Sequence, residues 1–242
     1  MRWPPVAVTV AFTILVVVMV ALFVIALDRA GERLGAAAEE RRRWRRRGAA
    51  LLGAWLAITG GLAGAGILQD FSRVPPPAAL LLLTTLALTV VVASSRVGAR
   101  LAFGLPIAGL VGFQSFRIAV ELLLLALARA GTMPLRMTLE GWNFDVLTGL
   151  SAIPIAMLAA RGRCPRWALW LWNLIGFGLL ATIVGIAVLS MPLPFQRFSM
   201  PGDDPFVTRA PFVWLPTVLV AAALLGHLLL LRRLIARERT GD

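Results

Sequence analysis

The stretch VAVTVAFTILVVVMVALFVIAL, residues 6–27, contains 22 residues and no charged side chain. A helix of about 20 apolar residues is long enough to cross the hydrocarbon core of a bilayer. The run is longer than the apolar region of a secretory signal peptide, and arginines follow it, so a retained membrane span is favoured over a cleaved leader. The stretch therefore predicts a helix that crosses a membrane.

Similar apolar runs recur along the whole chain, which has 242 residues and is 59% hydrophobic and 15% charged, with a mean hydropathy of +0.84. A soluble domain of this length rarely contains so many apolar residues. Short segments that alternate apolar and polar residues, as in a β-barrel, are not seen. We predict an all-α, polytopic membrane protein that forms a single membrane domain, 1–242, as a bundle of seven transmembrane helices. The predicted spans are 6–27, 49–68, 78–95, 102–128, 144–160, 167–191 and 211–231.

The charged residues predict how the bundle is oriented. The net charge is +12, and all 24 basic residues are arginines. In a soluble protein this charge would indicate nucleic acid binding, but here the arginines lie at span ends, so we expect no nucleic acid partner. Seventeen arginines lie in segments 28–48, 96–100, 161–166 and 232–242, and six lie in the opposite connections. The positive-inside rule places the arginine-rich face, including an Arg-rich loop at 28–48, in the cytoplasm.

The N-terminus is then expected outside and the C-terminus inside the cell. High arginine and alanine usage is typical of GC-rich bacterial genomes, so the predicted location is the bacterial cytoplasmic (inner) membrane.

A polar stripe interrupts the predicted span 102–128. Gln114, Arg117 and Glu121 lie within about 60° of one another on a helix. A charge at bilayer depth is costly, so it normally faces the protein interior or a cavity, and it often marks a functional site. We predict that Arg117 and Glu121 form the floor of a polar pocket in the outer half of the bundle. The structural alternative is a buried ion pair that satisfies itself.

Polar residues at the start of the next span are expected to complete this pocket. Asp145 and Thr148, together with Gln114 from the stripe, are the predicted wall groups. Asp145 is also the natural partner of Arg117 if the two helices pack together. Asn143 is interpreted as a helix N-cap.

A second polar level is predicted near the cytoplasm, where Asn173 and His227 lie on the last two spans. His227 is interpreted either as a group that titrates near neutral pH or as a packing histidine. The sequence GLSA around Ser151 faintly resembles the serine motif of rhomboid proteases. Helix lengths place Ser151 about 10 Å and His227 about 24 Å from the outer surface, too far apart for a catalytic pair.

Two segments predict contacts with partners. The run RRRWRRR, residues 41–47, is expected to bind anionic lipid headgroups, or to act only as a topology signal. Gly60 and Gly64 form a GxxxG spacing, which favours close packing inside the bundle or against a partner helix.

Metal and cofactor chemistry find no support in the sequence. The chain has one cysteine and one histidine, and it carries no zinc spacing, phosphate loop or dinucleotide motif. The adjacent carboxylates Asp203 and Asp204 are read as part of a solvated turn rather than as a cation site. We therefore expect neither a metal nor a cofactor.

Three stretches, FRIAVE (116–121), MTLEGWNFD (137–145) and PFVWLP (211–216), resemble a family of small bacterial multi-pass membrane proteins. The resemblance extends over 114–231 and implies the same fold class. It implies no activity, cofactor or catalytic residue.

Three functions remain open. The first is an outward-open pocket that binds or passes a small polar or anionic solute, or protons. The second is a membrane-embedded enzyme that acts on a lipid or isoprenoid substrate with Glu121 or Asp145 as base, and the third is an accessory subunit whose charged pair is structural. We favour the first, a protein that is not an enzyme, and no catalytic residue is assigned.

Overall fold

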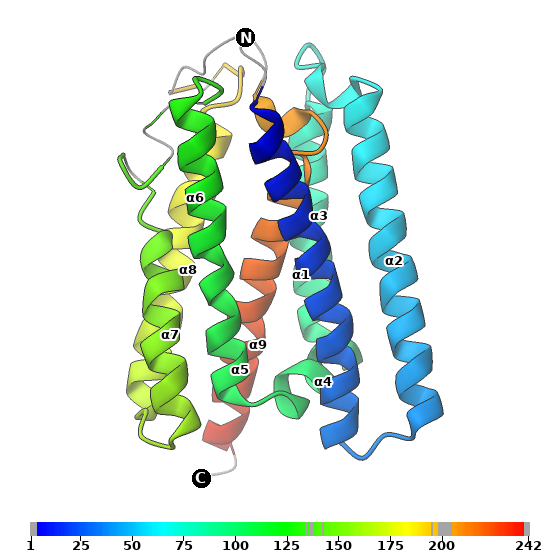
Figure 1. Cartoon of the computed structure of the whole chain (residues 1–242), viewed down its shortest axis with the longest axis vertical. Helices are drawn as coiled ribbons and strands as arrows, with labels where there is room; N and C mark the ends of the chain where they lie inside the picture. The colour runs from blue at the N-terminus through cyan, green and yellow to red at the C-terminus, as the bar shows by residue number, and fades with distance from the viewer. Residues whose placement is uncertain are drawn as a thin grey trace.

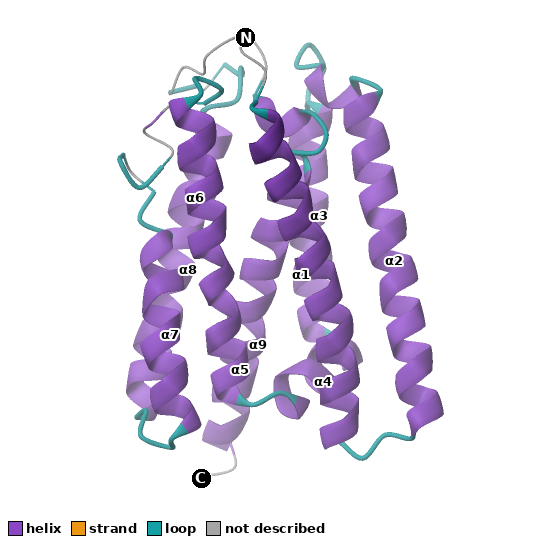
Figure 2. Cartoon of the chain, viewed as in Figure 1, coloured by secondary structure: helices purple, strands orange, loops and turns teal. Residues whose placement is uncertain are grey.

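The computed structural model describes residues 4–133, 135, 138–141, 143–194, 196–197 and 205–239, with side chains up to residue 236. Within these ranges all regular secondary structure is helical, as Figure 2 shows. The long helices are α1 (Val6–Arg33), α2 (Ala38–Gly64), α3 (Pro77–Ser94), α6 (Phe116–Arg129), α7 (Val146–Ala160), α8 (Arg166–Leu189) and α9 (Ala221–Arg239). The short elements are η1 (Ile67–Gln69), α4 (Arg96–Gly104), α5 (Ile107–Gly112), η2 (Phe113–Ser115), η4 (Phe206–Thr208) and η5 (Leu215–Val220).

Among the residues that the structure describes, five helical segments are long and apolar enough to cross a membrane: α1, α3, Ile107–Arg129, α8 and Leu215–Ala236. Their outward faces expose large apolar side chains, for example Ile14 on α1 and Ile175 on α8. Such faces are compatible with hydrocarbon and costly in water. The chain is an all-α protein whose helices fit an integral, multi-pass membrane protein.

The helices run side by side along one long axis, and the N- and C-termini lie at opposite ends of it (Figure 1). The connections α2–α3, α6–α7 and α8–α9 lie at the end that holds the N-terminus, and the connections α1–α2 and α7–α8 lie at the other. We call these the N-end and the C-end of the bundle. Phe12, Phe206 and Phe212 form an aromatic cluster within the apolar core near the N-end.

The segment 28–48, predicted as a loop, is helical except at residues 34–37. Gly35, with φ +74°, ends α1, where the N–H of Ala36 donates to the carbonyl of Gly31 over 2.9 Å. Helix α2 then begins at Ala38 with two glutamates in its first turn, which suit the positive end of the helix dipole. The loop prediction was wrong because it was based on polarity, and arginine and glutamate are good helix formers.

The predicted span 102–128 is divided in two. Helix α4 ends at Gly104, and Pro106, which has no backbone N–H, precedes α5. The continuous segment that follows is Ile107–Arg129, 23 residues long. Its start therefore lies five residues later than predicted, while α4 links the lower ends of α3 and α5 (Figure 1).

The last helix has an irregular first part. Residues Leu215–Val220 form a π-helix that contains Pro216. Since proline lacks the N–H that would bond one turn back, the backbone there departs from α geometry. Such departures inside membrane helices are tolerated where neighbouring protein groups, or water in a cavity, form hydrogen bonds with the freed backbone groups.

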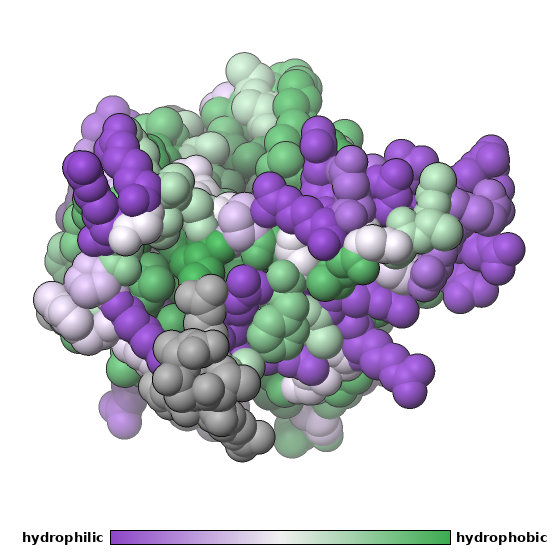
Figure 3. All heavy atoms as spheres, turned by 90° about the horizontal axis from the view of Figure 1, so that it is seen from below, coloured by the Kyte–Doolittle hydropathy of each residue, from purple (hydrophilic) through white to green (hydrophobic). Residues whose placement is uncertain are grey.

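Arginines at the C-end also hold helix ends together. Arg232 on α9 donates to the carbonyl oxygens of Ala93 and Ser95, at 2.6 and 2.9 Å, where α3 ends. Arg166 donates to the carbonyl oxygen of Leu234 over 2.5 Å. Viewed from this end, hydrophilic side chains gather toward the sides, with apolar atoms between them (Figure 3).

Candidate functional site

Arg117 forms its ion pair with Asp145. One guanidinium nitrogen, Nη1, donates to the Asp145 carboxylate over 2.5 Å, and the two side chains are 3% and 15% exposed. Asp145 lies directly before α7, and α7 packs against α6 so closely that a Cβ on Gly149 would lie 3.2 Å from Arg117 Cβ. Asp145, the partner of Arg117 expected if the two helices pack together, is therefore its partner in the structure.

Glu121 is held by two other donors instead of by Arg117. Its carboxylate accepts from the backbone N–H of Leu139 over 2.5 Å and from the side-chain amide of Asn143 over 2.6 Å. Glu121 is 2% exposed, so these two bonds replace water at both oxygens. Arg117 and Glu121 therefore do not pair with each other as predicted. Arg117 bonds to Asp145, and Glu121 bonds to Leu139 and Asn143, all in the segment before α7.

Part of this segment lies on the side of the bundle, against α6 and below its end. Glu121 is eight residues before the end of α6, which places it about 12 Å below that end. Because Leu139 and Asn143 bond to Glu121, the non-helical backbone before α7 lies at the same depth. At membrane depth, backbone N–H and C=O groups outside helices need hydrogen-bond partners from the protein. Glu121 is such a partner for the N–H of Leu139. The side-chain oxygen of Asn143 also accepts from the backbone N–H of Asp145 over 3.2 Å. This bond stabilises a turn before α7, so Asn143 is not the N-cap that the sequence predicted.

A cavity lies beside these groups in the half of the bundle near the N-end. Its volume is about 130 Å³, measured as the space open to the centre of a water-sized molecule. Its charged and amide side chains are Arg117, Glu121, Asn143 and Asp145, which come from α6 and the segment before α7. Thr208 and Thr217 also line it, with their hydroxyls bonded to backbone carbonyls.

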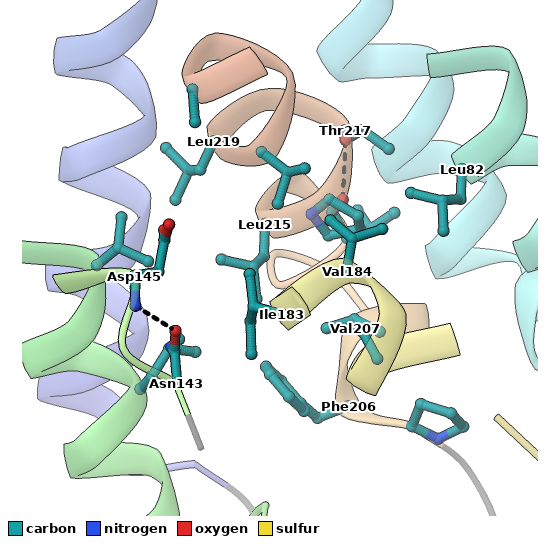
Figure 4. Close-up of a pocket in the computed structure, with 18 of the residues that line it drawn as sticks. Leu82, Asn143, Asp145, Ile183, Val184, Phe206, Val207, Leu215, Thr217 and Leu219 are labelled. Atoms are coloured by element: carbon teal, nitrogen blue, oxygen red, sulfur yellow. Dashed lines mark hydrogen bonds between the residues drawn. The ribbon is translucent and has the colours of Figure 1, made fainter. Parts of the chain in front are cut away.

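Apolar side chains from α3, α8, η4 and η5 form most of the remaining wall of this cavity. Figure 4 shows Asn143 and Asp145 on one side of the space and the labelled apolar groups on the others. The labelled apolar residues are Leu82, Ile183, Val184, Phe206, Val207, Leu215 and Leu219.

Gln114 and Thr148, the other two predicted pocket residues, are buried behind Arg117 and do not line this cavity. Gln114, in the 3₁₀ turn η2, donates to the carbonyl oxygen of Ala223 on α9 over 3.0 Å. Thr148 is 2% exposed on the first turn of α7.

The second predicted polar level is present as a contact. His227 Nδ1 lies 2.8 Å from the side-chain oxygen of Asn173, whose amide nitrogen donates to the His227 carbonyl over 3.3 Å. The separation in depth expected between the first turns of α7 and His227 was wrong. Since α7 begins deep in the bundle, Thr148 lies beside His227: a Cβ on Gly176 would be 3.1 Å from Thr148 and 2.8 Å from His227 Nε2.

Ser151 shares this depth but is engaged elsewhere. Its hydroxyl donates to the carbonyl of Leu147 over 2.6 Å and accepts from the indole N–H of Trp172 over 2.9 Å. A serine nucleophile must bond to its base. Ser151 therefore has no such arrangement, although the reason differs from the separation in depth inferred from the sequence.

The predicted partner segments lie on α2. In the run Arg41–Arg47, Arg41 and Arg45 each lie 3.6 Å from Asp28 of α1. Gly60 is used within the chain, since a Cβ there would lie 3.3 Å from the Trp214 ring, whereas Gly64 has no such neighbour within 4 Å.

No group of three or more metal-ligating side chains occurs in the part of the chain that the structure describes. Asp203 and Asp204 lie outside that part.

Sequence reasoning missed the role of Asn143 as a ligand of Glu121 and all of the apolar cavity wall. The Asx pattern NFD before α7 was the available signal for the former. The wall residues had no signal, because side chains that face an apolar cavity and side chains that face lipid have the same composition.

No protein-family profile, curated protein or solved structure matches the chain. The resemblance of the three stretches described above stays a prediction.

Proposed function

We propose that the chain crosses the bacterial inner membrane seven times, with its N-terminus outside and its C-terminus in the cytoplasm. The five long apolar segments are joined in this proposal by the second part of α2 and by α7, which is 15 residues long. The alternation of arginine-rich and arginine-poor connections supports it, as does the position of the termini at opposite ends of the bundle (Figure 1). The cavity then lies in the periplasmic half.

In this position the cavity is best suited to an amphipathic, lipid-class ligand. The observation that carries this proposal is the division of its wall into one polar side and an otherwise mostly aliphatic lining. A small polar solute would leave most of its hydrogen-bonding groups against aliphatic side chains, at a cost of several kcal/mol per unpaired group. An acyl or prenyl chain meets the same kind of apolar surroundings in the cavity as in the bilayer, so it enters without this cost.

Arg117 is the residue that would receive the polar end of the ligand. It lines the cavity, and its Nε and Nη2 groups are buried without a hydrogen-bond partner. Two N–H donors on a planar guanidinium match a carboxylate or phosphate group. The ligand class is therefore a lipid with an anionic or strongly accepting headgroup.

Binding is favoured over catalysis by the state of the two carboxylates. Glu121 already accepts from two donors, and Asp145 accepts from Arg117. Both carboxylates hold structural contacts that fix the segment before α7 and orient Arg117. A carboxylate that took up a proton as a general base would weaken these charge-assisted bonds.

Native mass spectrometry of the protein purified from its own membranes tests this proposal. We expect a bound lipid mass in the parent protein and its loss in Val184→Trp, which fills the cavity from α8. The matched control is Ile175→Trp, on the same helix but 53% exposed on the outer face. If the parent protein carries no lipid, or if both variants retain it equally, the cavity is not a lipid site.

A further inference from the structure

Four side chains beneath the cavity contain buried polar atoms that have no hydrogen-bond partner. These atoms are Gln114 Oε1, Arg117 Nε and Nη2, Thr148 Oγ1 and His227 Nε2. None of the four residues is more than 3% exposed. Buried polar atoms in proteins are nearly always satisfied by protein groups or by ordered water. Such a concentration in one region therefore indicates that something else completes the bonding.

The four side chains come together because glycines allow close helix packing. At Gly176 on α8, the space of a Cβ is taken by the His227 ring, whose Cε1 would lie 2.4 Å away, and Thr148 adjoins the same point. Gly226 on α9 receives the Gln114 amide, whose nitrogen would lie 2.5 Å from a Cβ there. Arg117 adjoins the residue after Thr148. Donors and acceptors from η2, α6, α7 and α9 thus surround one small volume.

Asn173 determines which nitrogen of His227 faces this volume. Its amide nitrogen donates to the His227 carbonyl, which leaves its side-chain oxygen, an obligate acceptor, 2.8 Å from Nδ1. Nδ1 must therefore carry a proton. In the neutral ring Nε2 is then an acceptor with a free lone pair, directed away from Asn173.

The cluster adjoins the floor of the cavity. Arg117 lines the cavity, and so does Ala223, whose carbonyl accepts from Gln114. His227 follows Ala223 by four residues on α9, about 6 Å along the helix. A water molecule that leaves the cavity beside Ala223 therefore has about one helical turn to travel to the level of His227.

We propose that bound water fills the space between these four side chains and connects His227 to the cavity as a proton-exchange site. Water offers both the acceptor that Arg117 lacks and the donor that Nε2 lacks, and the Thr148 hydroxyl can both donate and accept between them. A proton that arrives from the cavity on a water molecule, as hydronium, bonds to Nε2 and gives an imidazolium, while the neutral water molecule remains. The proton returns to water by the same path. The water site does not depend on which ligand occupies the cavity, because a headgroup that accepts from Nε and one N–H of Nη2 leaves the second N–H of Nη2 for the water.

The surroundings restrict this exchange to one charged neighbour. Arg117 is the charged group on this side of α6, and its Nη1 is bonded to Asp145. The groups that face His227 from α8 are Asn173 and the rings of Trp172 and Phe177, at 5.7 and 5.1 Å. None of these three carries a charge, so the charge of the ring and that of Arg117 are coupled with little screening.

His227 is the single histidine of the chain, so its ring can be observed alone. The test is solid-state NMR of protein labelled with ¹⁵N-histidine in lipid bilayers near neutral pH, with magnetisation transferred from water to the ring. We expect a protonated Nδ1, an unprotonated Nε2 and direct transfer from water to Nε2. Absence of water transfer in the parent protein, or a proton fixed on Nε2, overturns the proposal.

Two variants extend this test to the path. Thr148→Val removes the hydroxyl while nearly keeping the shape of the side chain, and it should abolish the transfer. The control is Thr182→Val on α8, whose hydroxyl bonds to its own helix at the Gly178 carbonyl on the exposed face, and it should leave the transfer unchanged. Equal transfer in the parent protein and Thr148→Val would show that the hydroxyl does not carry the path.

Discussion

Replacing Arg117 by leucine should destabilise the protein far more than replacing both members of its ion pair. In the single variant the Asp145 carboxylate, 15% exposed, loses the donor that lies 2.5 Å away. In Asp145→Leu the guanidinium, 3% exposed, is left without a counter-charge. Removing one partner of a buried pair costs about 3–5 kcal/mol, whereas replacing both by apolar groups is often nearly neutral.

This cost is large enough to measure by thermal unfolding. For a domain of about 150–250 residues, 1 kcal/mol shifts Tm by roughly 2–4 °C, so each single variant should lose roughly 6–20 °C. The double variant Arg117→Leu/Asp145→Leu should recover most of this loss. Tm is followed in one detergent at one scan rate, because membrane proteins often unfold irreversibly.

Arg129 and Glu140 provide the matched control pair. Their charged groups lie 2.6 Å apart, as close as the buried pair, but the side chains are 66% and 39% exposed. An exposed pair contributes about 0–1 kcal/mol, so the same cycle there should give a coupling near zero. If the Arg117–Asp145 cycle is equally small, or if the double variant is as unstable as the sum of the singles, the reasoning about a buried pair is refuted.

Three further predictions follow from the geometry. Glu121→Gln should lower stability by about 1–3 kcal/mol, because an amide N–H would face one of the two donors that the carboxylate now accepts from, and an unchanged Tm would contradict this. Gly176→Ala should cost about 1–3 kcal/mol because its Cβ would overlap the His227 ring, whereas Gly178→Ala on the same helix, with nothing within 4 Å, should be neutral or slightly stabilising; equal Tm values for the two would refute the close contact. Burial raises the pKa of the Cys164 thiol above its ordinary value, so labelling by an impermeant maleimide should be slow at neutral pH and faster as the pH rises toward that pKa. In intact cells it should occur only after the membrane is opened, and labelling from outside would reverse the proposed orientation.

The sequence predicted an all-α chain with long apolar helices and two of the buried polar contacts. Long apolar runs are a strong signal in any position, and a buried charge needs a partner, so Asp145 and Asn173 were identifiable as neighbours of Arg117 and His227. The segment 28–48 was mispredicted because charge marks the end of the membrane and does not mark the end of a helix. Pro106 was the available sign that the span beginning at 102 would break.

The depth of α7 was beyond sequence reasoning. The length of the connection after α6 is known, but nothing in it states that the chain returns about 12 Å into the bundle before α7 begins. That return depends on the tertiary contact between Glu121 and the backbone of Leu139. It brings Thr148 to the level of His227, which helix counting from the outer surface had separated by more than a turn.

In the proposed function, the cavity beside Arg117 holds a lipid-class ligand with its polar end at the guanidinium. An experimental density map of the protein purified from native membranes, at a resolution that shows lipids and waters, tests this most directly. We predict an elongated density along Leu215 and Leu219 that ends within hydrogen-bonding distance of Arg117. A cavity that holds only water, or that side chains fill completely, would contradict it.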